Sequence, residues 1–189
     1  MKDRPILFST DMVKAILEGR KTQTRRIVKF PGDFDGKAVY DNHPFGLKYS
    51  AQDETVQRLF PKWNAGDILW VRETWIDLED HSVGFHEYLY KADCLPDYAR
   101  QIKWRPSIFM PREACRILLE VTDVRVERLS DISERNAEAE GVEILRRNQP
   151  PMAGSAAIGI YMELWESING KGSWEKNPWV WVITFKRIS

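Results

Sequence analysis

Cysteine and long apolar runs are scarce in this chain of 189 residues, and each absence excludes a class of protein. The two cysteines, Cys94 and Cys115, are too few for a disulfide framework or a cysteine-based zinc knuckle. No apolar run approaches the ~20 residues that a transmembrane helix needs. The first residues, Met-Lys-Asp-Arg-Pro, lack the apolar core of a signal peptide. We therefore expect a cytoplasmic protein that does not associate with a membrane.

The chain also has no net charge, because 28 lysines and arginines balance 28 acidic residues. A uniformly basic, histone-like nucleic-acid binder is thereby excluded. The charges are nevertheless segregated: residues 20–29 hold five cations and no acid, and residues 100–116 hold five cations against Glu113 alone. If these two segments fold together, they form a stripe for phosphates beside Trp104. The alternative is that each segment is a solvated charged face.

Residues typical of metal sites and of familiar catalytic motifs are few as well. His43, His81, His86 and Cys94 do not have the spacing of a zinc site, so we interpret them as polar loop residues. Gly-rich phosphate loops and the G-x-S-x-G turn of serine hydrolases are absent. We expect neither a metal ion nor another cofactor.

Tryptophan, in contrast, is abundant, with eight residues in the chain. An indole ring serves either as a core residue or as a platform on which bases stack. Strand alternation assigns Trp179 and Trp181 to a core strand, and helical spacing assigns Trp165 to a helix core. Trp75 and Trp104 are left as the candidates for base stacking.

Hydrophobic periodicity predicts many strands and a few short helices. Strands are expected at 4–8, about 22–30, 67–75, 85–91, 115–128 and 178–186. Helices are expected after a cap at Ser9 or Thr10, over 134–140 after a cap at Ser133, and over 157–168. Residues 31–66 and 145–155 are expected to be loops, and residues 106–111 an extended connector. This pattern is typical of a small, mostly β barrel in an α+β context.

Several segments, in order along the chain, resemble one protein family. They are I-L-E-G-R-K-T-Q-T-R-R (16–26), G-D-I-L-W-V-R-E (66–73), S-E-R-N-A-E-A-E-G (133–141) and W-V-W-V-I-T-F (179–185). With W-R-P-S-I-F-M-P-R (104–112), they resemble ASCH domains of the PUA-like superfamily, in the form commonly carried by phages and prophages. The resemblance implies a single PUA-like β-barrel domain over residues 1–189, with insertions near 31–63 and 77–110.

The same resemblance implies a cleft that handles RNA or a modified nucleoside. One bacterial branch of the family is an amidohydrolase that removes the acetyl group from N4-acetylcytidine with a lysine, a threonine and a glutamate. In this chain the lysine and threonine of that pattern fall on Lys21 and Thr24, and the glutamate falls on Glu140. The inserts, which the short enzymes lack, can cover the cleft, enlarge it for a polymer or abolish the activity.

The chemistry of amide hydrolysis is compatible with these three residue types. Thr24 supplies a hydroxyl nucleophile, a desolvated Lys21 accepts its proton, and Glu140 orients the lysine or relays the proton to the leaving nitrogen. A straight strand would point positions 21 and 24 to opposite faces, so the scheme requires Lys21 to lie in the turn after Gly19. Each residue also has an ordinary structural explanation at a helix end, in a strand or on a helix surface.

Two hypotheses follow from the sequence. The first is a binding protein for RNA, single-stranded nucleic acid or a modified nucleoside. Its expected contacts are Arg20, Arg25, Arg26, Arg105 and Arg112 on phosphates, with Trp75 and Trp104 against bases. The second is an amidohydrolase that uses Lys21, Thr24 and Glu140. The sequence gives no indication of the oligomeric state.

Overall fold

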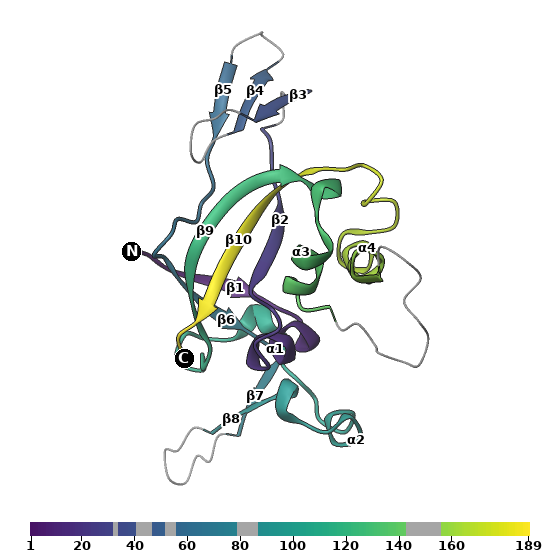
Figure 1. Cartoon of the computed structure of the whole chain (residues 1–189). Coiled ribbons are helices and arrows are strands. Elements are labelled where there is room, and N and C mark those ends of the chain that lie inside the picture. Colours follow the sequence, from purple (N-terminus) through teal and green to yellow (C-terminus); the bar gives the residue numbers. More distant parts are fainter. Residues whose placement is uncertain (32–33, 41–46, 52–55, 79–86, 143–155) are drawn as a thin grey trace.

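The computed structural model describes residues 1–31, 34–40, 47–51, 56–78, 87–142 and 156–189. Its centre is a five-stranded sheet with the order β1-β6-β9-β10-β2 (Figure 1). The strands are β1 (Asp3–Leu7), β2 (Gln23–Ile27), β6 (Ile68–Arg72), β9 (Leu118–Arg128) and β10 (Trp179–Arg187). β1 runs parallel to β6, and every other neighbouring pair in this sheet is antiparallel.

The long pair β9 and β10 curves through the middle of the molecule (Figure 1), and residues on the two faces of β10 belong to two different apolar clusters. On one face of β10, Trp181 and Ile183 belong to the main core, where they pack with residues of β1, β6 and β9. On the other face, Val180 and Val182 pack against residues of α3 (Glu134–Ala139) and α4 (Ala156–Asn169). The strict alternation of these side chains follows from the two-residue period of a strand.

The short helices begin and end at the residues that the sequence indicates. Ser9 caps α1 (Thr10–Leu17) by accepting a hydrogen bond from the Met12 amide at 3.4 Å. Ser133 caps α3 in the same way, through the Asn136 amide at 3.3 Å. Gly141 follows α3 with a φ of +86°, a conformation that glycine adopts without strain. These capping predictions are confirmed.

The predicted closure into a β-barrel is wrong, although the α+β class is confirmed. β1 and β2 are the two edges of the sheet, and we call the gap between these strands the open seam. Lys2 and Phe8 bond to β6 through their main chains, so the alternate residues Pro5 and Leu7 face β2. Pro5 has no N–H to donate to a ladder across the seam, and proline within a sheet is confined to an edge of this kind.

Two of the connecting segments also differ from their predictions. Residues 31–66, expected as a loop, contain β3 (Phe34–Tyr40), β4 (Leu47–Ala51) and β5 (Val56–Leu59), which form an antiparallel sheet of their own. This small sheet extends away from the main sheet in Figure 1. Its strands are short and follow one another closely, so no window of the sequence showed a clear period. The connector near 106–111 contains a 3-10 turn over Ser107–Phe109.

The remaining elements lie at the opposite end of the molecule (Figure 1). They are β7 (Trp75–Asp77), β8 (Tyr88–Tyr90), α2 (Pro96–Ala99) and a 3-10 turn over Lys91–Asp93. Arg116 joins this part to the main sheet, because its guanidinium bonds both Glu73, at 2.9 Å, and Asp93, at 3.1 Å. A further 3-10 turn over Leu129–Asp131 links β9 to α3.

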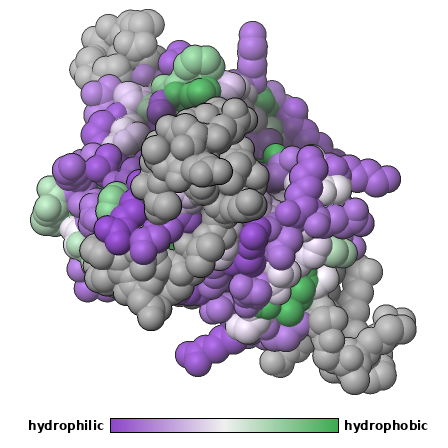
Figure 2. All heavy atoms as spheres, turned by 90° about the horizontal axis from the view of Figure 1, so that it is seen from above, coloured by the Kyte–Doolittle hydropathy of each residue, from purple (hydrophilic) through white to green (hydrophobic). Residues whose placement is uncertain are grey.

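Some predictions fall on residues outside the described ranges. These are the loop 145–155, the start of the strand at 85–91, and His43, His81 and His86. In the described part of the chain, no helix is long and apolar enough to cross a membrane. The same part contains no group of three side chains suited to a metal ion. Figure 2 shows that hydrophilic residues dominate the visible described surface, with apolar residues in small separate patches.

Candidate functional site

A cleft of about 880 Å³ lies along the open seam, between β1 on one side and β2 on the other. Six aromatic side chains line it: Phe8, Phe60, Trp63, Tyr161, Trp165 and Trp181. Five cationic side chains also line it: Arg25, Arg26, Lys29, Lys62 and Arg72. Among the described residues, Glu140 is the one acidic residue in the lining. The cleft is therefore aromatic and, by formal charge, positive.

Lys21 lies in the turn between α1 and β2, where the hydrolysis scheme needs it. Gly19, with a φ of +75°, ends the helix, and the Lys21 amide bonds to the carbonyl of Ala15 at 3.0 Å. The ammonium donates to the carbonyls of Gln23 and Glu140, both at 2.8 Å, and to the Glu140 carboxylate at 2.9 Å. All three of its hydrogens thus have acceptors. Lys21 is fully buried behind the wall of the cleft and is not one of its lining residues.

Burial lowers the pKa of Lys21 below the usual value of a lysine. The negative charge and the hydrogen bond of Glu140 act in the opposite direction, but they do not outweigh the loss of hydration. A lowered pKa suits a general base. The three hydrogen bonds instead suit a positioning residue, because an ammonium that donates three bonds has no lone pair to accept a proton.

Glu140 is held between two cations at the end of α3. One of its carboxylate oxygens accepts from Lys21, and the other accepts from Arg25 at 2.9 Å. Arg25 also pairs with Glu127 of β9, and its guanidinium lies 5.8 Å from the ring centroid of Tyr161. We call Lys21, Arg25, Glu127 and Glu140 the buried ion cluster. Its formal charges cancel, which offsets the cost of burying Lys21, Arg25 and Glu140, whereas Glu127 is half-buried and also pairs with Arg125.

Thr24 lies near the start of β2 and lines the same cleft as Glu140. It is 1% exposed, and its oxygen accepts a hydrogen bond from Arg26 at 3.0 Å. The structure therefore brings Thr24 and Glu140 to one cleft and joins Lys21 to Glu140. Lys21 does not bond to the Thr24 hydroxyl: its ammonium bonds to Gln23 and Glu140, and the hydroxyl accepts a hydrogen bond from Arg26 instead.

Arg26 crosses the open seam. Its guanidinium donates to the carbonyl of Leu7 on β1 at 3.0 Å and to the carbonyl of Arg25 on β2 at 3.2 Å. It also lies 5.5 Å from the ring centroid of Phe8. Burial lowers the pKa of Arg26. Cations at 20–26 thus satisfy main-chain carbonyls that an open sheet would otherwise leave without donors.

Two of the seven predicted nucleic-acid contacts, Arg25 and Arg26, line the cleft. Arg25 is fully engaged with two glutamates, so contact with a phosphate requires that pairing to break. Arg20 lies outside the cleft and bonds to Glu18 and to the carbonyl of Gly141.

The other four predicted contacts lie outside the cleft lining as well. Trp75 is 3% exposed and packs with Met110, so its ring is a core residue. The exposed guanidinium of Arg105 lies 5.3 Å from that ring. Trp104 is half-buried and donates its indole N–H to a main-chain carbonyl, and Arg112 pairs with Asp3.

The aromatic lining was missed because its residues are also core residues. Spacing assigned Tyr161, Trp165 and Trp181 to the core, which the structure confirms, and the same side chains form the wall of the cleft. Phe60 and Lys62 were missed because residues 31–66 were expected to be a loop. The one sequence signal for them is the run F-P-K-W, in which a lysine lies between two aromatic residues.

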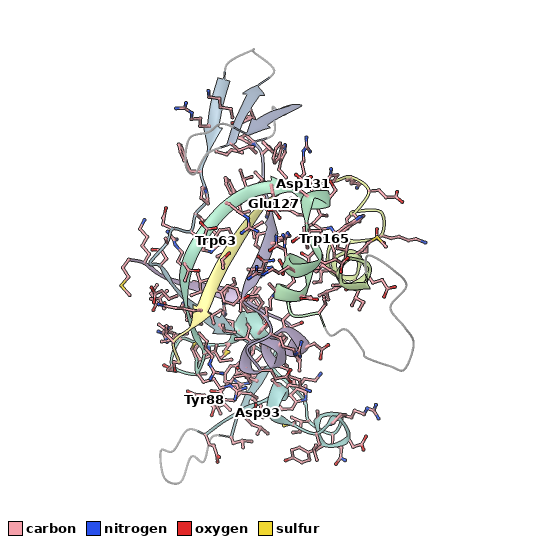
Figure 3. All side chains as sticks on the ribbon, in the orientation of Figure 1. Trp63, Tyr88, Asp93, Glu127, Asp131 and Trp165 are labelled. Carbon is pink, nitrogen blue, oxygen red and sulfur yellow. The ribbon has the colours of Figure 1, made fainter. Side chains whose placement is uncertain are left out.

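Two buried indole groups at the cleft have unused hydrogen-bonding capacity. The N–H groups of Trp63 and Trp165 have no acceptor among the described residues. Both residues are buried, with 6% and 4% of their surface exposed, so such acceptors would be expected. Figure 3 labels both residues, with Trp165 on α4. A buried N–H without an acceptor costs free energy, about 1–3 kcal/mol. A ligand that carries oxygen acceptors would recover it.

Comparison with known proteins gave one similar solved structure. No family model and no curated protein matches the chain. The crystal structure of the ASCH domain from Lactobacillus crispatus JV V101 is 14% identical in sequence, with a TM-score of 0.44. The match covers 98% of this chain and 79% of that one. The family in its name is the family that the sequence motifs resemble.

Proposed function

We propose that the cleft binds a nucleoside unit, either within RNA or another single-stranded nucleic acid or as a free modified nucleoside. The composition of the cleft carries this proposal: six aromatic and five cationic side chains line one cavity. Aromatic rings hold unstacked bases, and lysine and arginine hold phosphates. A volume of about 880 Å³ lies within the range of small-molecule sites, roughly 300–1,000 Å³.

Polar groups in the lining supply the means to recognise a base. The Glu140 carboxylate is a hydrogen-bond acceptor for an exocyclic amino group, and the Thr24 hydroxyl both donates and accepts. The unused N–H groups of Trp63 and Trp165 are donors for base or phosphate oxygens. A few placed polar groups in a mostly aromatic wall are typical of a site that selects its ligand.

Intrinsic tryptophan fluorescence offers a direct test, since Trp63, Trp165 and Trp181 line the cleft. We expect a mixed-sequence RNA oligonucleotide to quench this fluorescence, with an affinity that falls as salt concentration rises. The variant Phe60→Ser alters the rim of the cleft, where Phe60 is 58% exposed, and should weaken binding. Phe109→Ser is the matched control, because Phe109 is 70% exposed and lies outside the lining.

The proposal fails if neither oligonucleotides nor nucleosides bind. It also fails if Phe60→Ser and Phe109→Ser weaken binding equally, because the cleft would then have no special part in it.

A second candidate function is hydrolysis of an acyl amide on the N4 atom of cytosine. The specific observation in its favour is that Thr24 and Glu140 face one cleft while Lys21 holds Glu140 in place. In this scheme the Thr24 oxygen bonds to the acyl carbon and the C–N bond breaks. The hydroxyl proton passes through the base to the departing nitrogen, and water then cleaves the acyl-threonine ester. Lys21 acts as the base only after it loses a proton and releases one of its three acceptors.

Incubation with N4-acetylcytidine, followed by chromatography of cytidine and acetate, tests this second function. We expect Thr24→Ala and Glu140→Gln to abolish product formation if the scheme is right. Product formation that survives both Thr24→Ala and Lys21→Ala would refute the assigned roles. If the unaltered protein binds the nucleoside but does not hydrolyse it, the hydrolysis function is refuted and only the binding function is left.

A further inference from the structure

The two ends of the cleft differ in chemistry. Thr24 lies near the beginning of β2, and at this end Arg26 and Arg25 already bond to the Thr24 hydroxyl and the Glu140 carboxylate. Lys29 lies two residues past the end of β2, and it lines the cleft together with Lys62. Five residues of extended chain separate Thr24 from Lys29, which corresponds to about 16 Å along the strand. One end therefore suits a neutral, hydrogen-bonding group, and the other suits an anion.

Within the described ranges, no carboxylate lies within ion-pair distance of Lys29 or Lys62, in contrast to Arg25 in the buried ion cluster. Partial burial lowers the pKa of Lys62, and the positive charges of Arg26, Arg4 and Lys29 lower it further. These neighbouring charges raise the positive potential at Lys62, an arrangement that a bound anion stabilises.

The surroundings of Lys62 favour a phosphate that is attached to a nucleoside. Its ammonium lies 4.5 Å from the ring centroid of Trp63, whose buried N–H has no acceptor in the described part of the chain. Phosphate oxygens are acceptors for the ammonium and for such an N–H alike. An isolated small anion would leave the aromatic walls beyond the lysines unused.

We propose that Lys29 and Lys62 form a phosphate subsite at one end of the cleft, so that its ligand is a phosphorylated nucleoside. This inference rests on the proposed nucleoside-binding function and specifies its ligand class. The phosphate is either a terminal monoester of a free nucleotide or a diester within a strand, and both present anionic non-bridging oxygens. Lys62 belongs to the segment 31–63, which the family resemblance predicts to be an insertion relative to the short enzymes. The proposed subsite would then be absent from those short enzymes.

Calorimetric titration of the full chain with matched ligands tests the subsite. The probes are each of the four nucleosides, its 5′- and 3′-monophosphate, and a short oligonucleotide without a terminal phosphate. We expect the phosphate to improve affinity about tenfold or more over the nucleoside, because it adds charge-assisted hydrogen bonds. This improvement should shrink as salt rises from about 0.05 to 0.5 M. Tight binding of the oligonucleotide alone would identify the diester as the source.

The double variant Lys29→Ala/Lys62→Ala should remove the improvement in affinity that a phosphate gives over the matched nucleoside. Both lysines are exposed, so the fold should tolerate the change. The control Lys103→Ala/Lys176→Ala removes the same charge from exposed positions outside the cleft and should keep the improvement.

The results separate the subsite from the function on which it rests. Nucleosides that bind without any gain from a phosphate, or a gain that survives Lys29→Ala/Lys62→Ala, would overturn the subsite and leave the nucleoside cleft intact. Failure of nucleosides, nucleotides and oligonucleotides to bind would overturn both.

Discussion

The ammonium of Lys21 and the carboxylate of Glu140 form an ion pair 2.9 Å long in which the two side chains are 0% and 2% exposed. The same ammonium bonds to the main-chain carbonyl of Glu140 at 2.8 Å. Lys21 therefore fastens the turn before β2 to the end of α3 through both the side chain and the main chain. It fixes the carboxylate that faces the cleft.

Lys21→Met should destabilise the fold strongly. The change leaves the buried carboxylate of Glu140 with Arg25 alone and leaves two main-chain carbonyls without donors. Breaking one side of a buried ion pair costs about 3–5 kcal/mol. Urea unfolding monitored by circular dichroism measures the loss. Lys186→Met is the control, because Lys186 pairs with Glu120 at the surface and should cost under about 1 kcal/mol. Similar losses for the two variants would contradict a special role for the buried pair.

Gly141→Ala should be more costly than an equivalent change at Gly170. Both glycines have positive φ, +86° and +95°, so each alanine is strained by about 1–2 kcal/mol. A Cβ atom at Gly141 would also lie 2.8 Å from the Cβ atoms of Ala15 and Lys21, whereas one at Gly170 meets open space. Overpacking of this kind adds about 1–3 kcal/mol.

Thermal and urea unfolding of the two glycine variants give this difference directly. If Gly170→Ala is as destabilising as Gly141→Ala, the close contact of Gly141 with the turn before β2 does not contribute to the free energy of unfolding.

Trp165→Phe should weaken nucleic-acid binding several-fold, and Trp104→Phe should not change it. Trp165 lines the cleft and carries an unused N–H group, which phenylalanine lacks. Stacking of a base on an aromatic residue contributes about 1–3 kcal/mol, of which a smaller ring retains a part. Trp104 lies outside the lining. Fluorescence anisotropy of a labelled oligonucleotide measures both affinities. An effect of Trp104→Phe alone would show that Trp104, as the sequence predicts, and not Trp165 stacks on the base.

Tyr90 should make the stability of the protein fall with pH in alkaline solution. Burial raises the pKa of Tyr90 to about 12, against an ordinary value near 10, and its hydroxyl donates to the Ala114 carbonyl at 2.7 Å. Between pH 10 and 12 the folded protein keeps a proton that the unfolded chain releases. The free energy of unfolding therefore decreases as pH rises through this window.

Tyr90→Phe removes this contribution, so its free energy of unfolding should fall less steeply between pH 10 and 12. Ultraviolet absorbance of phenolate gives a second readout, since the step near pH 12 should disappear in the variant. Identical pH profiles for the two proteins would show that Tyr90 does not titrate in this range.

Helix ends and strand positions were predictable because local chemistry determines them. The hydroxyl of Ser9 or Ser133 satisfies amides within three residues, and the glycine that follows needs no partner elsewhere in the chain. The burial of Trp181 and Ile183 follows from strand alternation in the same way. Each of these features is a property of a few consecutive residues.

Closure of the sheet was not predictable, because it depends on whether two strands that are far apart in the chain pair with each other. Pro5 was a local sign that β1 is an edge, but the identity of its neighbours is a tertiary property. The site shows the same division. The family pattern singles out Thr24 and Glu140, which line the cleft and whose roles stay predictions, whereas Trp165 and Lys62 reach it through packing of α4 and of the segment after β5.

The open seam exposes part of the backbone of β1 and β2 to the cleft. The main-chain groups of Pro5 and Leu7 face away from β6, and those of Ile27 face away from β10, so both edges present peptide groups along the cleft. Replacement of a side chain leaves those peptide groups where they are. A ligand in this cleft would therefore meet a pattern of donors and acceptors that does not depend on which side chains β1 and β2 carry.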